Sequence, residues 1–119
     1  MGLSTHVLDT MHGCPAAGMS VRLFATAHGG TQATLVKTMQ LNADGRNPDG
    51  LLFDHNSLKI GTYRLEFDVA GYFKSRKVVL PEPNFLNIVN LDFGIANPQE
   101  HYHVPLLVSP WSYSTYRGS

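Results

Sequence analysis

Hydrophobic and polar residues alternate along much of this chain with the two-residue period of a β-strand. The alternation is unbroken over residues 62–69, which therefore predict a strand with one buried face. Weaker alternation predicts strands over 19–28 and 33–41, with Leu35 on the hydrophobic face of the second. Shorter stretches predict the remaining strands, at residues 3–9, 51–54, 85–93, 102–108 and 111–117.

Turn-forming residues separate these stretches, most clearly at Asp44-Gly45 and at Pro48-Asp49-Gly50. Only the segment from Gly71 to about Lys77 favours a helix, and it is too short to be stable without packing on a sheet. Short strands at this spacing predict an all-β fold, a two-sheet sandwich of about eight strands with one short helix. We expect residues 1–119 to form a single domain, because a chain of this length can bury a core without disulfides or metal.

The charge balance and the cysteine count narrow the range of expected binding partners and cellular compartments. Nine Lys and Arg residues match nine Asp and Glu residues, so we expect neither nucleic acid nor an anionic membrane surface as a partner. The single cysteine, Cys14, precludes an internal disulfide framework. The first dozen residues lack the features of a signal peptide, so we expect a cytoplasmic protein. A leader peptide that had been cleaved off would leave no trace in the sequence, so the periplasm and the peroxisome are the alternative locations.

Two histidines lie on predicted strand faces that the sandwich core does not cover. His6 projects outward with Leu8, and His103 projects outward with Leu107. Apolar neighbours on an outward face suggest that another subunit covers it. His101 points the same way as His103, and with His6 as a third ligand the set gives an alternative interpretation, a zinc site.

Four stretches carry a more specific signal. Leu3–Asp9 with Gly13–Ala17, the Asp44-Gly45-Arg46 turn and His101–Pro110 each resemble the transthyretin-related 5-hydroxyisourate hydrolases. The closing Tyr116-Arg117-Gly118-Ser119 resembles the C-terminal tetrapeptide that separates these hydrolases from transthyretin. The resemblance covers essentially the whole chain.

The resemblance implies a transthyretin-like sandwich that assembles as a homotetramer, a dimer of dimers, with active sites in a central channel. It implies hydrolytic opening of 5-hydroxyisourate to 2-oxo-4-hydroxy-4-carboxy-5-ureidoimidazoline in urate degradation, with no cofactor and no metal. The alternative function is a transthyretin-like carrier that binds a thyroid-hormone-like small molecule in the same channel.

The same resemblance implies the site residues and their roles. One of His6 and His103 activates water while the other contacts the heterocycle, and the choice between them stays open. Arg46 orients the substrate and stabilises the oxyanion. Ser119 acts through its hydroxyl or its terminal carboxylate, and Gly118 lets the backbone turn toward the site. The expected catalytic residues are His6, Arg46, His103 and Ser119, and the expected substrate-binding residues are His6, Arg46, Tyr116, Arg117 and Gly118.

Overall fold

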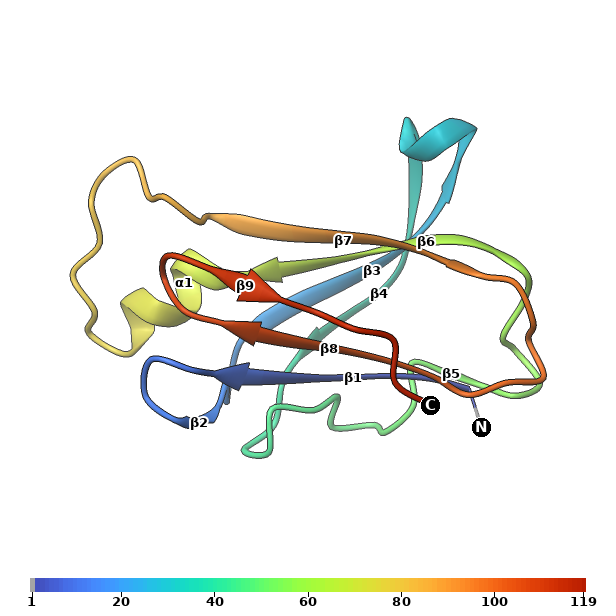
Figure 1. The fold of residues 1–119 in the computed structure, drawn as a ribbon, viewed down its shortest axis with the longest axis horizontal. Coiled ribbons are helices and arrows are strands. Elements are labelled where there is room, and N and C mark those ends of the chain that lie inside the picture. The colour runs from blue at the N-terminus through green and yellow to red at the C-terminus, as the bar shows by residue number, and fades with distance from the viewer. Residues whose placement is uncertain (1) are drawn as a thin grey trace.

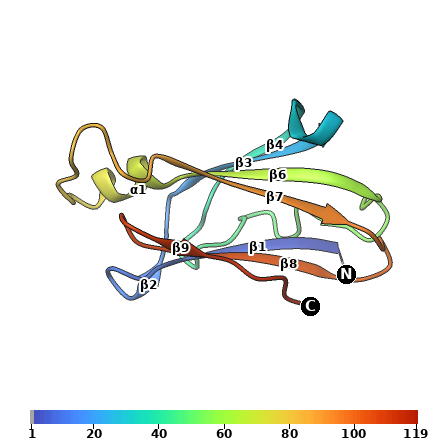
Figure 2. The same cartoon turned by 45° about the horizontal axis from the view of Figure 1, so that its top comes forward.

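The computed structural model describes residues 2–119 and arranges them as two β-sheets in stacked layers, seen face-on in Figure 1 and separated in Figure 2. The elements are β1 (Gly2–Asp9), β2 (Cys14–Pro15), β3 (Ser20–Ala27), β4 (Gln32–Gln40), β5 (Phe53–Asp54), β6 (Gly61–Asp68), α1 (Val69–Ser75), β7 (Ile88–Ile95), β8 (Tyr102–Val108) and β9 (Tyr113–Ser114), with a 3₁₀ turn at His28–Gly30. The all-β prediction of two sheets and one short helix is confirmed.

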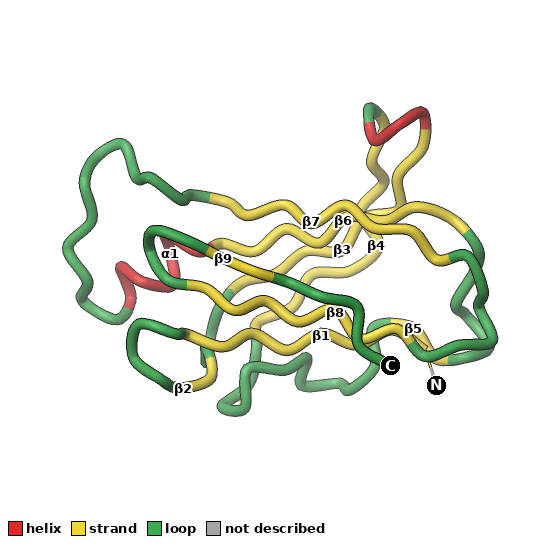
Figure 3. The backbone as a smooth tube through the Cα atoms, viewed as in Figure 1, coloured by secondary structure: helices red, strands yellow, loops and turns green. Residues whose placement is uncertain are grey.

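The first sheet has the order β2-β1-β8-β9, with β5 also paired to β1, and the second has the order β4-β3-β6-β7. β1 and β8 run parallel, whereas the other neighbouring strands are antiparallel. Segment 41–52 is a loop that follows the free edge of β1 (Figure 3). This arrangement puts the beginning, the middle and the end of the chain next to one another in one sheet.

The alternating hydrophobic residues fill the space between the two layers. In β6, Tyr63, Leu65 and Phe67 are buried while their polar neighbours are more exposed, as the alternation predicts. Leu3 and Leu106 face them from the first sheet and are fully buried. Each such side chain contributes about 2 kcal/mol to folding by leaving water.

Helix α1 begins two residues earlier than the sequence predicts and also ends two residues earlier. The Asp68 carboxylate caps it by accepting a hydrogen bond from the Gly71 backbone N–H at 3.0 Å. The prediction misplaced the start because Val69 is buried and continues the strand alternation, although it is already helical. The helix ends before Lys77, which takes the left-handed conformation with φ of 66°.

Three predicted strands differ in extent from the observed ones. The strand expected from residue 85 begins at Ile88, and Phe85 instead lies exposed with its ring 5.9 Å from that of Trp111. The strand expected over 111–117 is reduced to the two residues of β9, and that expected over 51–54 to the two residues of β5. β5 and β9 pair with the first sheet over two residues each, a length that the hydrophobic pattern does not encode.

The β3–β4 hairpin also corrects the prediction for residues 33–41. A register shift between Leu23 and Phe24 interrupts the pairing of the two strands. Beyond it the hairpin extends past the sandwich (Figure 1), so Leu35, predicted to face the core, is 51% exposed. Within residues 2–119, no helix has the length and apolar character needed to cross a bilayer.

Candidate active site

Four neighbouring segments of the first sheet bring the predicted catalytic residues side by side. In the parallel register of β1 and β8, Ser4 lies opposite His103 and His6 lies opposite Pro105. Arg46 forms an antiparallel bridge with His6 on one side, and Gly118 forms one with His103 on the other. Across the sheet the order is therefore Arg46, His6, His103 and Gly118. Ser4, His6 and His103 all lie on the half-buried outward face.

The turn before Arg46 is held against β1 by its own hydrogen bonds. The Asn42 side-chain oxygen accepts hydrogen bonds from the backbone N–H groups of Asp44 and Arg46, at 2.9 and 3.1 Å. Gly45 has φ of 72°, and its carbonyl accepts a hydrogen bond from the Val7 N–H at 2.9 Å. A Cβ atom on Gly45 would lie 2.5 Å from the Val7 carbonyl oxygen, so this approach requires glycine.

The electrostatic environment keeps both site histidines neutral. Burial lowers the pKa of His6 from its ordinary 6.5, and the Arg46 guanidinium lowers it further, while a backbone hydrogen bond with Asp44 raises it. Burial also lowers the pKa of His103, followed by the nearby Arg46, His6 and His101. Neutral imidazoles are therefore present near pH 7, as a water-activating base and a hydrogen-bond partner require.

His101 and His103 both contact Ser4, a residue that the sequence analysis did not single out. The Ser4 hydroxyl oxygen lies 2.8 Å from His103 Nδ1 and 3.2 Å from His101 Nε2. Within the part of the chain that the structure describes, no three or more His, Cys, Asp or Glu residues are grouped as metal ligands would be. The zinc interpretation of His6, His101 and His103 therefore finds no support in the geometry. The outward position of Ser4 beside His6 was the available sequence signal.

The C-terminal segment is fastened to β8 at His103. The Gly118 N–H donates to the His103 carbonyl at 2.7 Å, and the His103 N–H donates to the Gly118 carbonyl at 3.1 Å. A Cβ atom on Gly118 would lie 3.0 Å from His103 Cβ and 3.2 Å from its ring carbon Cδ2. Gly118 is not in the left-handed region, so its role differs from the turn that the sequence analysis expected: it permits close approach to His103.

The other residues of the closing tetrapeptide point in different directions. The Arg117 guanidinium donates to Glu100 Oε1 at 2.8 Å and to the His101 carbonyl at 3.1 Å, and its central carbon lies 4.3 Å from the centre of the Tyr102 ring. These contacts hold the Arg117 guanidinium against Glu100, the His101 backbone and the Tyr102 ring. Tyr116 is 60% exposed, and Ser119 is also exposed.

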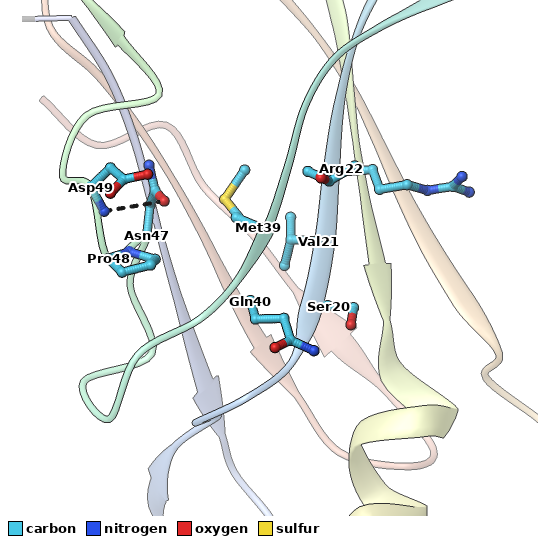
Figure 4. A pocket seen from close by; sticks show the side chains of 9 residues that line it. Ser20, Val21, Arg22, Met39, Gln40, Asn47, Pro48 and Asp49 are labelled. Atoms are coloured by element: carbon cyan, nitrogen blue, oxygen red, sulfur yellow. Dashed lines mark hydrogen bonds between the residues drawn. The ribbon is translucent and has the colours of Figure 1, made fainter.

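A pocket of about 510 Å³, large enough for a small heterocycle, has Arg46 in its lining, whereas His6 and His103 do not line it. It is lined by Ser4, Thr5, Asn42, Arg46, Asn47, Pro48, Gly50, Leu51 and His101. A second pocket, of about 690 Å³, lies between β3, β4 and residues 47–49 (Figure 4). None of the predicted site residues lines it, and Figure 4 shows Arg22 pointing away from Asp49. The smaller pocket is therefore the better candidate for the substrate.

Comparison with known proteins gives consistent results. The model of the HIUase/Transthyretin family matches residues 3–118. The chain is 49% identical to the 5-hydroxyisourate hydrolase of Pseudomonas aeruginosa, over 98% of this chain and 90% of that protein. It superimposes on the crystal structure of (S)-allantoin synthase with a TM-score of 0.91 and 44% identity, covering 99% of this chain and 43% of the other. It superimposes on sea bream transthyretin in complex with thyroxine with a TM-score of 0.82 and 27% identity, covering 99% and 95%.

Proposed function

Because the chain belongs to the HIUase/Transthyretin family, we propose that it is a hydrolase that opens the six-membered ring of 5-hydroxyisourate. The observation that carries this proposal is the alignment of Arg46, His6 and His103 across one face of the first sheet. These residue types supply a base, a fixed cation and a hydrogen-bond partner, which together suit hydrolysis of a cyclic amide.

The chemistry begins with water. A neutral histidine takes a proton from the water molecule as its oxygen attacks a ring carbonyl carbon, and the carbonyl oxygen becomes an oxyanion. When the carbonyl re-forms, the ring C–N bond breaks and the nitrogen leaves with the proton held by the histidine. The carbon keeps the oxygen of water in a carboxylic acid group, which releases its remaining proton to solvent as a carboxylate and gives 2-oxo-4-hydroxy-4-carboxy-5-ureidoimidazoline.

Arg46 supplies the positive charge at the reacting oxygen. A guanidinium carries a positive charge and presents paired N–H donors that match carbonyl oxygens. Its backbone bridge to His6 fixes the start of its side chain beside that imidazole. We therefore assign substrate orientation and oxyanion stabilisation to Arg46.

The tetrapeptide completes the site in this proposal. Gly118 pairs with His103 and so brings the tail against this histidine. Tyr116 and Ser119 stand on either side of Gly118 in the sequence. Both side chains are exposed and available to a substrate or a neighbouring subunit. Tyr116 orients the heterocycle, Arg117 and Gly118 contribute to substrate binding, and Ser119 contributes its hydroxyl or its terminal carboxylate. We propose that these sites lie in the central channel of a homotetramer.

The direct test follows freshly generated 5-hydroxyisourate by ultraviolet absorbance, with and without the protein. We expect rapid decay with the parental protein and a large loss of rate in His6→Ala and His103→Ala. His55→Ala is the matched control, because His55 is an exposed histidine outside the site. Decay at the spontaneous rate in the presence of the parental protein would refute the proposal, and near-parental rates in both variants would refute the site assignment.

Chelators provide a separate test of the chemistry. Because Arg46 supplies the positive charge, we expect activity to survive removal of metal ions by EDTA. A zinc site would instead be needed to lower the pKa of a bound water. Loss of activity in EDTA that zinc restores would contradict the proposed mechanism.

The second candidate function is a carrier of a thyroid-hormone-like small molecule. The similarity to a transthyretin solved with thyroxine favours it, at lower identity than the similarity to the hydrolase. Calorimetric titration with thyroxine distinguishes the two functions. Tight binding without turnover of 5-hydroxyisourate would establish the carrier.

A further inference from the structure

A chain of hydrogen bonds leads to His103 from the start of β1. The Gly2 backbone nitrogen lies 3.1 Å from His101 Nδ1, and His101 Nε2 lies 3.2 Å from Ser4 Oγ. The Ser4 oxygen in turn lies 2.8 Å from His103 Nδ1. The steps of hydrolysis derived above use neither His101 nor Ser4, although both line the candidate substrate pocket and Ser4 contacts His103.

The donors in this chain follow from its first member. A backbone N–H can only donate, so His101 Nδ1 must accept, and a neutral His101 carries its proton on Nε2. That proton points to the Ser4 oxygen, which leaves the single Ser4 hydroxyl proton to point to His103 Nδ1. A neutral imidazole has one N–H group, so the proton of His103 lies on Nε2.

We propose that Ser4 and His101 are positioning residues that hold neutral His103 with its proton on Nε2, so that His103 donates a hydrogen bond to the substrate and His6 is the base. The inference rests on the proposed hydrolase function and resolves which histidine activates water. An Nε2 atom that already carries a proton cannot take one from water, whereas it can stabilise a negatively charged oxygen.

The surroundings of the two histidines support this division of roles. Arg46, His6 and His101 face His103, and all three disfavour its protonated form. Burial and Arg46 lower the pKa of His6 as well, but a hydrogen bond with the backbone of Asp44 opposes them and favours the protonated form. When one ring nitrogen of neutral His6 donates to that carbonyl, the other has a free lone pair and can accept a proton. His6 therefore has the environment of a base and His103 that of a donor.

Ser4 substitutions test the positioning role. We expect Ser4→Ala to lower kcat about tenfold, the effect of one hydrogen bond, with little change in KM. Ser4→Thr keeps a hydroxyl at the same position and should restore most of the rate. Full kcat in Ser4→Ala would overturn the proposal, as would equal losses in the two variants.

His101 gives an independent variant in case Ser4→Ala folds poorly. We expect His101→Phe, which keeps a ring but removes both nitrogens, to lower kcat to a similar extent. His55→Phe is the matched control, because His55 is exposed and lies outside the chain of hydrogen bonds. An unchanged kcat in folded His101→Phe would overturn the role of His101.

Glutamine variants test the division of roles between the histidines. A glutamine at position 103 keeps an N–H donor but cannot act as a base, so His103→Gln should retain much more activity than His103→Ala. His6→Gln should be as inactive as His6→Ala, because no donor replaces a base. The opposite pattern would make His103 the base and overturn the proposal.

Nitrogen NMR of the imidazole rings detects these hydrogen bonds and does not require that the protein hydrolyse a substrate. The His103 signals are identified as those lost in His103→Gln. We expect them to show a proton on Nε2 and an Nδ1 signal that is shifted by the hydrogen bond from the Ser4 hydroxyl. This shift should be lost in Ser4→Ala. A proton on Nδ1 would overturn the proposal. If the parental protein fails to hydrolyse 5-hydroxyisourate, this experiment still tests the hydrogen-bond chain, so the two failures can be told apart.

Discussion

At the scale of single residues, Arg46 affects both site histidines at once. It lowers the pKa of His6 and of His103, in each case after burial, and it is itself exposed at the edge of the sheet. A positive charge close to two imidazoles disfavours their protonation. In the proposed mechanism, the position of Arg46 beside β1 therefore affects the pH range of activity as well as the oxyanion.

This effect predicts a pH dependence. A base must be neutral, so activity should rise as pH increases through the lowered pKa of His6, and its acid limb should lie below the ordinary 6.5. In Arg46→Gln the acid limb should move to higher pH, because one cause of the lowered pKa is gone, and kcat should fall. Arg22→Gln, on the other sheet, is the control. An unmoved acid limb in Arg46→Gln would contradict this account.

Gly118 is the second residue whose effect is local. An added methyl group would lie 3.0 Å from His103 Cβ and press against its ring. We therefore expect Gly118→Ala to lower kcat about tenfold by displacing the His103 ring, with a small change in Tm. Gly94→Ala is a control, because Gly94 is not in the left-handed region and a Cβ atom there would meet only the Gly61 carbonyl oxygen, at 4.0 Å. Parental activity in Gly118→Ala would show that His103 tolerates the displacement.

At the scale of elements, a buried carboxylate fastens helix α1 to the first sheet. Asp9 is 1% exposed at the end of β1, and it accepts hydrogen bonds from the Tyr72 hydroxyl at 2.7 Å and the His12 backbone N–H at 2.9 Å. His12 Nδ1 lies 2.6 Å from the same carboxylate. Burial raises the pKa of Asp9, but these hydrogen bonds outweigh burial and lower it overall.

Loss of the Tyr72 hydroxyl should therefore destabilise the fold. We expect Tyr72→Phe to lower the free energy of unfolding by about 1–3 kcal/mol, because a buried carboxylate oxygen loses one of its two hydrogen-bond partners and keeps only His12. Urea unfolding measures the change, with Tyr113→Phe as the control at an exposed tyrosine. Because the pKa of Asp9 is lowered in the folded state, its stabilisation is present above 3.8 and is lost as pH falls through the lower folded value. Equal stability of Tyr72→Phe and the parental protein would show that the hydrogen bond from Tyr72 to Asp9 does not stabilise the fold.

At the scale of the whole molecule, the outward face of the first sheet is only half solvated in the single chain. Ser4, His6, Leu8, His103 and Leu107 are partly buried there. Large aromatic side chains continue the exposed apolar surface along the C-terminal segment: Trp111 at 57%, Tyr113 at 45% and Tyr116 at 60% exposed. Apolar surface of this extent on a small protein is typical of an interface.

We therefore predict a homotetramer in solution, with a mass by light scattering four times the 13.1 kDa of one chain. Leu107→Glu would bury a charge in the interface and should dissociate it. Ile60→Glu is the control, since Ile60 is 70% exposed and lies outside the first sheet. A parental monomer that still turns over substrate would contradict the prediction.

The sequence by itself determined which side of β1, β6 and β8 a residue occupies. The alternation in residues 62–69 gave the buried face of β6 correctly, and the same period put His6 and His103 on an outward face. Asp44-Gly45 correctly predicted the turn before Arg46. These features depend on residues close together in the chain, whose geometry is fixed by local backbone conformation.

Only the tertiary structure decided which strands lie together. Ser4 contacts two histidines more than ninety positions away because β1 and β8 pair in parallel, and Gly118 approaches His103 because the tail follows the same sheet. Hydrophobic burial drives every strand toward the core without specifying its neighbour or register. The hydrogen-bond chain from His101 to His103 therefore has no signature in the sequence pattern, since it depends on a register that exists only after the sheet has formed.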